Sequence, residues 1–328
     1  MADISKDLLD EDIELMTRVA TFYHLEDLTQ DQIAKRLNLS RAKVGRILRK
    51  AKSKGIVEIS VRPHPVLNFQ LEAALVDRFG LKQALIAVNQ SDPVAQRSTV
   101  AQLVAGYLSR NLRDGMLVAV GMGSNTGAIA EYVFHPLAHD CTFISAMGGS
   151  PVAGVPMNPD NICSRFAIRF GGKSESLYAP GYVDNLALRE MLLNHETIRQ
   201  TLNRARRSDM AVIGVGDLSK ESNAVKLGWF PAQEVYHPEG PEAVGDMLGN
   251  FFDINGNEVT EGRKGATVGL SMDELRQLPE VIMVASEPRK VLAILGALRT
   301  GVVNILATTA GNAQSILTLD KETGGPGA

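Results

Sequence analysis

Apolar and polar residues near the N-terminus follow helical spacing. Residues 12–24 place an apolar side chain at every third or fourth position, which predicts an amphipathic helix. The apolar positions of this helix are Ile13, Met16, Val19, Ala20 and Tyr23. Two shorter helices are predicted after it, one carrying Ile33, Ala34 and Leu37 on one face and the next running from Arg41 to about Lys54.

The residues between these helices favour a tight turn. Thr29 and Gln32 have the spacing of a capping box, and Ser40 can cap the following helix. Asn38 tolerates the positive φ that such a turn needs, and Gly55 can end the last helix. This set of positions predicts a helix-turn-helix. A helical hairpin used only for oligomerisation is the structural alternative.

The last of these helices is strongly basic. Between residues 35 and 54 the chain has nine basic residues and no acidic one, whereas residues 65–328 hold 22 basic and 27 acidic residues. A run of this kind can be a solvated helix face. Within a helix-turn-helix, it indicates a surface that meets the phosphates of DNA.

The predicted DNA contacts follow from the geometry of the motif. Early residues of the second helix would meet base edges, and flanking cations would hold phosphates. Candidate base readers are Ser40, Arg41, Lys43 and Arg46; candidate phosphate contacts are Arg36, Arg49, Lys50 and Lys52; Thr29 and Gln30 complete the predicted DNA-binding set. Residues 56–61 alternate in polarity and predict a short wing strand.

From about residue 66, strand-like and helix-like segments alternate. Short apolar runs at 117–120, 143–145, 210–213, 281–284 and 305–307 predict buried parallel strands. Helical stretches are predicted at 93–110, 186–204 and 290–299. The pattern indicates a doubly wound, Rossmann-like α/β domain, in which ligands bind in the loops at the carboxyl ends of the strands.

The loop after the first of these runs is the strongest candidate ligand site. Glycines at 121, 123 and 127 would let a ligand approach the backbone, and Ser124, Asn125 and Thr126 offer polar groups at a helix N-terminus. The loop matches neither a Walker A motif nor a dinucleotide fingerprint. Phosphate binding is the favoured interpretation; a turn that needs glycine for its geometry alone is the alternative.

Other strand-end loops supply further candidates. Gly148 and Gly149 would expose bare backbone to a ligand, and Asn158 and Asn161 could bind sugar hydroxyls, as could Asp160 unless it only caps a helix. Asp246 could accept a hydrogen bond from a hydroxyl. Near the last helical stretch, Glu287 and Lys290 share a loop in which the lysine ammonium could reach a phosphate.

Composition limits the class of protein. At 328 residues, with 45% hydrophobic residues and a net charge of −3, the chain predicts two globular domains, residues 1–62 and 66–320, with a disordered tail at 321–328. No apolar run is long enough for a membrane span, and the start of the sequence does not resemble a signal peptide. Two cysteines and an isolated His135/His139 pair predict neither disulfides nor a metal site. We expect a cytoplasmic protein without a cofactor.

Taken together, these motifs resemble the SorC (sorbitol-operon) family of sugar-responsive regulators over residues 12 to about 318. The resemblance rests on 28–57, on Gly121-Met122-Gly123-Ser124, on 243–253 beginning Ala-Val-Gly-Asp, and on Lys290 with Ala293-Ile294. It implies a fold like that of sugar-phosphate isomerases, tetramers on paired operators, and a sugar phosphate as inducer. Ser124, Asn125, Thr126 and Lys290 would then bind phosphate, with Asn158 and Asp246 on the sugar. Where the family usually has glycines, this chain has Ser286 and Glu287.

The sequence therefore predicts a regulator, and not an enzyme, of a carbohydrate-catabolism operon. In this prediction a phosphorylated sugar or sugar alcohol controls the attachment of a homo-oligomer to operator DNA, and repression is the more usual outcome in the family. An isomerase- or deaminase-like enzyme with an appended DNA-binding domain is the alternative; Asp246 and Glu287 are its evident candidate bases. A third possibility is a large domain that only oligomerises.

Overall fold

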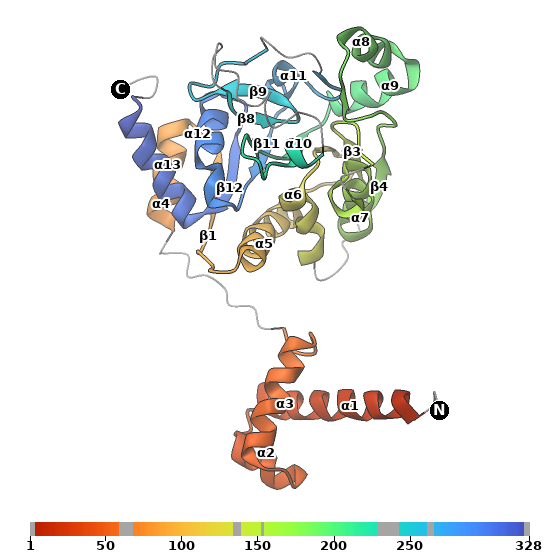
Figure 1. The fold of residues 1–328 in the computed structure, drawn as a ribbon, viewed down its shortest axis with the longest axis vertical. Helices are drawn as coiled ribbons and strands as arrows, with labels where there is room; N and C mark the ends of the chain where they lie inside the picture. The colour runs from red at the N-terminus through yellow and green to blue at the C-terminus, as the bar shows by residue number, and fades with distance from the viewer. Residues whose placement is uncertain are drawn as a thin grey trace. The chain divides into compact units, whose positions relative to one another are not determined.

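The computed structural model describes residues 4–58, 68–133, 139–151, 154–227, 243–260 and 266–324. The chain divides into two units, residues 1–63 and 64–328, which are described separately below. Helices of the N-terminal unit are α1 (Ile4–His24), α2 (Gln30–Leu37) and α3 (Arg41–Ser53) (Figure 1).

The caps that delimit α2 and α3 are those that the sequence predicts. The Thr29 hydroxyl accepts a hydrogen bond from the Gln32 backbone N–H at 3.3 Å, while the Gln32 side chain accepts one from the Thr29 N–H at 2.8 Å. The Ser40 hydroxyl accepts from the Lys43 N–H at 3.2 Å. Asn38 adopts the left-handed conformation, with φ of 52°, and turns the chain between the helices.

A small apolar core joins the three helices. Val19, Ile33 and Val44 are fully buried, one from each helix, and Ala34 lies with them. Of the apolar positions of the predicted first helix, Ile13 is 47% exposed and Tyr23 is 37% exposed. Phe22 is buried beside Tyr23, because the last turn of α1 packs against α2 through that side.

The predicted wing strand is not found where it can be checked. Residues 56–58 form no strand, and residues 59–61 lie outside the described part of the chain. Ile56 and Val57 pack instead near Ala51, at the end of α3.

A parallel sheet forms the centre of the C-terminal unit. The described residues give it seven strands in the order β1-β12-β11-β6-β2-β3-β4, and each neighbouring pair is parallel. The strands are β1 (Gln83–Ala87), β2 (Leu117–Val120), β3 (Cys141–Ser145), β4 (Gly172–Glu175), β6 (Met210–Gly214), β11 (Val281–Val284) and β12 (Ile305–Thr309). The five strands predicted from apolar runs are confirmed, because both faces of the sheet are covered and these runs are buried except at Leu117, which is partly buried.

Helices cover the two faces of this sheet (Figure 1). One face is covered by α5 (Pro93–Asn111), η2 (Ile129–Tyr132) and α7 (Pro159–Phe170), and the other by α4 (Phe69–Phe79), α9 (Glu196–Ala205), α11 (Met272–Arg276), α12 (Val291–Arg299) and α13 (Ala310–Glu322). Shorter elements are α6 (Ser124–Ala128), η3 (Val155–Met157), α8 (Leu186–Asn194), α10 (Asn223–Lys226) and η4 (Pro288–Lys290). The architecture is the doubly wound α/β fold that the sequence predicts.

Two helical predictions need correction. The stretch at 186–204 is not one helix but two, α8 and α9, because His195 has an extended backbone and serves as the C-cap of one and the N-cap of the other. The predicted tail begins too early: α13 continues to Glu322, and Thr323 accepts a hydrogen bond from Arg299 at 2.8 Å. Residues 325–328 lie outside the described part of the chain.

The strand order places a topological switch point between β2 and β6. After β2 the chain adds β3 and β4 toward one edge, whereas after β6 it adds β11 and β12 toward the other. Loops leaving β2 and β6 therefore diverge to opposite faces of the sheet and leave a crevice, the usual ligand site of such folds. Small antiparallel sheets complete the unit, formed by β7 (Gly216–Asp217), β8 (Ala243–Met247) and β9 (Asn250–Asp253), and by β5 (Tyr182–Val183) with β10 (Ala266–Thr267).

Candidate functional site

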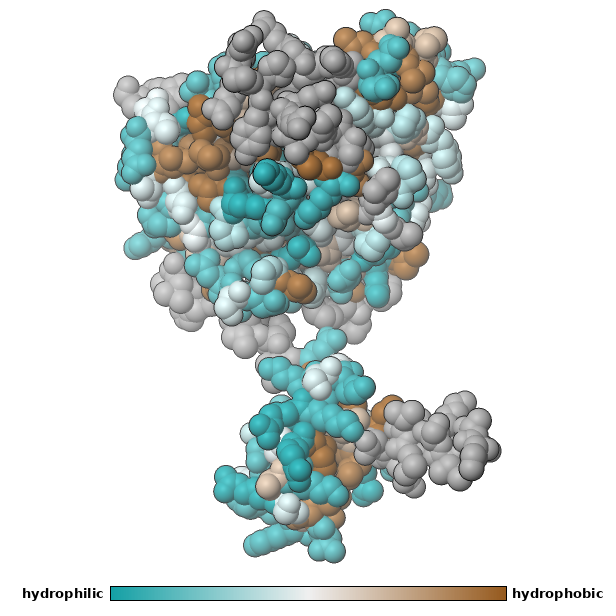
Figure 2. Space-filling model, viewed as in Figure 1, coloured by the Kyte–Doolittle hydropathy of each residue, from teal (hydrophilic) through white to brown (hydrophobic). Residues whose placement is uncertain are grey.

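The basic helix α3 has one buried and one exposed face. Val44 and Ala51 are fully buried against the other helices. The basic side chains that the sequence predicts as DNA contacts on α3 are all exposed, namely Arg41, Lys43, Arg46, Arg49, Lys50 and Lys52. This unit accordingly shows a largely hydrophilic surface (Figure 2). Exposed cations beside the N-terminus of a recognition helix can meet both base edges and phosphates.

Of the other predicted DNA-binding residues, Arg36 lies in the last turn of α2, 3.1 Å from Glu26, and the rest lie at the start of α2 and α3. Thr29 and Ser40 are N-caps, so their hydroxyls already accept backbone hydrogen bonds. Gln30 is half-buried next to Gly45, where an added Cβ would lie 3.4 Å from its Oε1. Ala42 and Gly45 share one face of α3 with Arg46 and Arg49, and they carry no charge that would mark them in the sequence.

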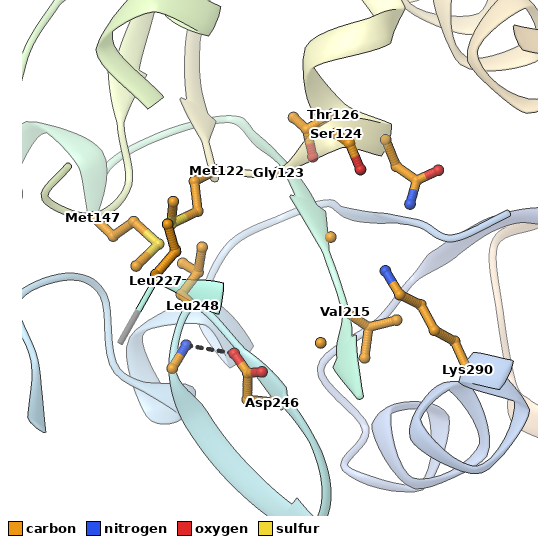
Figure 3. Close-up of a pocket in the computed structure, with 14 residues that line it drawn as sticks. Met122, Gly123, Ser124, Thr126, Met147, Val215, Leu227, Asp246, Leu248 and Lys290 are labelled. Carbon is orange, nitrogen blue, oxygen red and sulfur yellow. Dashed lines mark hydrogen bonds between the residues drawn. The ribbon is translucent and has the colours of Figure 1, made fainter. Parts of the chain in front are cut away.

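In the C-terminal unit, a cavity opens at the switch point of the sheet (Figure 3). It encloses about 570 Å³ of empty space, open solvent included. The lining residues come from the loop after β2 with the start of α6, from the loop after β3, from residues 214–216, from Leu227 directly after α10, from β8 and the turn after it, and from η4: Met122, Gly123, Ser124, Asn125, Thr126, Met147, Gly214, Val215, Gly216, Leu227, Asp246, Leu248, Gly249 and Lys290.

The loop after β2 presents polar groups to the cavity. Gly123 has φ of 130°, a conformation that side-chain-bearing residues rarely adopt, and it turns the chain directly into α6. Thr126 follows on α6 and is fully buried, and its hydroxyl oxygen has no hydrogen-bond partner among the described residues. A buried hydroxyl without a partner is costly unless a ligand or water satisfies it.

A buried charged cluster borders the cavity at η4. The Lys290 ammonium, whose side chain is 8% exposed, lies 3.2 Å from Oε2 of Glu287. The Asn125 amide donates to the same carboxylate at 2.9 and 3.2 Å, and its own oxygen accepts from the Ser286 hydroxyl at 2.7 Å. The side chains of Glu287 and Asn125, both predicted to contact the effector, are therefore hydrogen-bonded to each other in this structure.

These contacts keep Glu287 ionised. Burial alone would raise the pKa of its carboxyl, but the charge of Lys290 and the hydrogen bond from Asn125 outweigh burial and lower the pKa to about 2. Glu287 is thus a weak base at neutral pH, which counts against the general-base role that an enzyme would require.

Asp246 reaches the cavity from β8, across from Lys290 (Figure 3). Its Oδ2 accepts a hydrogen bond from the Gly249 backbone N–H at 2.9 Å. Its Oδ1 lies against Gly216, where a Cβ would approach within 1.9 Å. The carboxylate is therefore held in place by backbone, and it can accept further hydrogen bonds from a ligand.

The structure does not bring all predicted effector residues together. Gly123, Ser124, Asn125, Thr126, Asp246 and Lys290 line the cavity at the switch point. Gly149 and Asn158 line a different cavity between β3 and α7, and Gly148 and Asn161 line neither of the two.

Asn158 has a local structural role. Its side chain accepts a hydrogen bond from the Ser150 N–H and donates to the Ser150 carbonyl, both at 2.8 Å, so it fastens the loop after β3. Gly148 is required for packing, because a Cβ there would lie 2.4 Å from the Ala179 carbonyl oxygen. Sequence patterns alone could not separate these roles from ligand binding.

Comparison with known protein families accounts for both units. A sugar-binding domain family matches residues 64–318, and a winged helix-turn-helix DNA-binding family matches residues 26–58. The chain belongs to the SorC family. Membership in this family means that the N-terminal unit binds DNA and that the large unit binds a small-molecule effector.

Relatives of known description are similar along nearly the whole chain. The transcriptional regulator LsrR of Klebsiella pneumoniae is 30% identical over 93% of this chain and 93% of its own. The sugar-binding domain of a transcriptional repressor from Vibrio fischeri is 43% identical, with a TM-score of 0.71, over 77% of this chain and 99% of its own. The full-length sorbitol operon regulator of Klebsiella pneumoniae is 25% identical, with a TM-score of 0.72, over 93% of this chain and 99% of its own.

These SorC-family relatives are transcriptional regulators and not enzymes. This chain is accordingly a sugar-binding transcriptional regulator, and the enzyme alternative is not supported. In the described part of the chain, no helix has the length and apolar character needed to cross a membrane.

Proposed function

We propose that this regulator represses a carbohydrate-catabolism operon and that a phosphorylated sugar or sugar alcohol, bound in the cavity at the switch point, controls its attachment to operator DNA. The observation that carries the effector half is the buried Thr126 hydroxyl, which lacks a partner among the described residues in a cavity that Lys290 also lines. A ligand oxygen would satisfy this hydroxyl, and the ammonium favours an anionic group.

The two ends of the cavity suit the two ends of such a ligand. Ser124 and Thr126, at the start of α6, and Lys290, on η4, would hold the phosphate through hydroxyl, backbone N–H and ammonium groups. Asp246 lies across the cavity and would accept hydrogen bonds from sugar hydroxyls. A charged and a hydroxyl-binding end together favour a sugar phosphate over either group alone.

On the DNA side, α3 supplies the contacts. Arg41 and Lys43 lie in its first turn and Arg46 one turn later, all exposed, where they can reach base edges. Arg49 and Lys50 would bind phosphates. Because one such helix reads only a half-site, we propose that a homo-oligomer in the cytoplasm places two recognition helices on paired half-sites.

The experiment measures binding to duplexes from the promoter region next to the protein's own gene, by fluorescence anisotropy, with and without a panel of sugar phosphates and their unphosphorylated parents. We expect at least one sugar phosphate to weaken binding to the operator, while its parent sugar does not.

A pair of lysine variants assigns the response to the cavity. Lys290→Met should keep operator affinity but lose the response to the sugar phosphate. Lys173→Met removes an ammonium that is 78% exposed, and it should retain the response. No release by any sugar phosphate, or an unchanged response in Lys290→Met, would contradict the proposed effector site.

A further inference from the structure

The Glu287 carboxylate already occupies an environment built for an anion. Lys290 lies 3.2 Å from its Oε2, the Asn125 amide donates to both oxygens, and the Ser286 backbone N–H donates to Oε2 at 3.3 Å. Its side chain is only 13% exposed. An ammonium, an amide and a backbone N–H are donors that also bind phosphate.

A second cation stands near the same carboxylate. Arg97, on α5, places its Nη2 3.9 Å from Oε1 of Glu287, which is an ion pair at the limit of contact. The Nε of Arg97 is buried and has no hydrogen-bond partner among the described residues. Arg97 therefore has an unused donor close to an acceptor that is at present held mainly by Lys290 and Asn125.

A phosphate at Lys290 and the carboxylate of Glu287 compete for one ammonium. If both remained, the phosphate would lie within a few ångströms of a buried negative charge, and repulsion would offset much of the attraction to Lys290. The effector must therefore move Glu287 or bind weakly. A shift of the carboxylate toward Arg97 would keep it paired, because a buried charge without a partner is strongly unfavourable.

We propose that Glu287 is an internal counter-anion of the effector site, that the phosphate of the effector displaces it from Lys290, and that Arg97 then pairs with it. This inference rests on the phosphate site of the proposed function. It makes Glu287 a specificity-determining residue: an uncharged sugar cannot displace the carboxylate, so the Glu287–Lys290 pair would discriminate a phosphorylated ligand from its parent.

The first test removes the competing charge. Inorganic phosphate is titrated calorimetrically, at constant ionic strength and neutral pH, into the full-length protein and into E287Q. We expect the dissociation constant to fall about tenfold in E287Q, because the neutral amide no longer repels phosphate. E131Q is the matched control, since Glu131 pairs with Arg165 at 2.9 Å; it should bind phosphate as the wild type does.

The second test addresses Arg97. R97Q should weaken phosphate binding about fivefold in the wild-type background, because the displaced carboxylate loses its new partner. In the E287Q background the same substitution should change affinity less than twofold, since no carboxylate is displaced. Arg165 lines a small cavity beside α5 together with Arg97. R165Q should have little effect in either background. If R97Q weakened phosphate binding equally in both backgrounds, the proposed shift of Glu287 from Lys290 to Arg97 would be wrong.

Other outcomes are equally decisive. If wild type and E287Q bind phosphate with the same affinity, the phosphate site stands but the role of Glu287 is wrong. If neither binds phosphate while the circular dichroism of both is native, the phosphate site of the proposed function fails as well. Should E287Q not fold, E287A provides the same comparison, because it also removes the charge.

Discussion

The cations on α3 and two buried cations of the C-terminal unit are held in opposite ways. On α3 the basic side chains are exposed; Arg41 is 71% exposed, and its contact with Asp31 is long, at 3.8 Å. In the C-terminal unit, Lys290 is 8% exposed and Arg299 is 2% exposed, and each lies within 3.2 Å of a carboxylate oxygen. The exposed cations are screened by water and salt, so each contributes little alone, whereas each of these buried cations is paired with one carboxylate among the described residues.

This difference suits the two ligands. DNA presents a long row of phosphates, and many exposed cations can add small, salt-dependent contributions to binding it. A small effector offers one charged group, so discrimination must come from a few groups fixed in a water-poor cavity.

Removing the partner of a buried cation should be the most damaging change. Asp320 is 3% exposed and accepts hydrogen bonds from Arg299 at 2.7 and 3.1 Å, with Arg78 as a second partner. Asp320→Ala leaves the buried guanidinium of Arg299 without its carboxylate partner and should lower the free energy of unfolding by about 3–5 kcal/mol. Urea denaturation would measure this. Asp273→Ala, at a position 80% exposed and paired with Arg276, should change it by about 0.5 kcal/mol or less.

The Glu287 pair should make stability depend on pH in an acidic window. The pKa of Glu287 is lowered from 4.5 to about 2, since Lys290 and Asn125 more than offset burial. Its contribution is therefore present above pH 4.5 and is lost as the pH falls toward 2, by about 3 kcal/mol at most. Between pH 5 and about 2, the free energy of unfolding should depend less on pH in Glu287→Gln than in the wild type. Equal dependence on pH in both proteins would contradict this assignment.

On the DNA side, Arg41→Ala should weaken operator binding by roughly 1–3 kcal/mol and relax specificity. Lys50→Ala is the matched comparison. Loss of a phosphate contact should weaken binding equally on operator and random duplexes, and it should lower the slope of log affinity against log salt concentration by about one. Anisotropy titrations at several salt concentrations would separate the two roles. Equal losses on both duplexes for Arg41→Ala would rule out a base-reading role.

The smallest effect is expected for an exposed ion pair. Arg36 lies 3.1 Å from Glu26 and over the ring of Phe22, but the two charged side chains are 54% and 44% exposed. Glu26→Ala should therefore reduce the free energy of unfolding by less than about 1 kcal/mol. A loss near that of Asp320→Ala would show that exposure is a poor guide to the energetics of these pairs.

Local patterns determined much of this protein. The capping residues Thr29 and Ser40, the left-handed Asn38 and the basic face of α3 all follow from neighbours within a few residues, which is why the helix-turn-helix could be predicted from sequence. The buried strands were equally clear, because a strand covered on both faces is apolar at every position. The glycine loop at 121–127 was also clear from the sequence, because its glycines and polar residues directly follow one of these strands, and it forms one wall of the cavity.

Only the tertiary structure decided which polar residues share a site. Asp246 and Lys290 are far from Ser124 in sequence, and the strand order brings all three to one cavity while it sends Asn158 to another. Asn125 and Glu287, both predicted to bind the effector, also bind each other, and Arg97 lies close to Glu287 from α5 without any local signal in the sequence. Spacing along the chain encodes helices and turns, whereas contacts between distant loops depend on how the sheet is assembled.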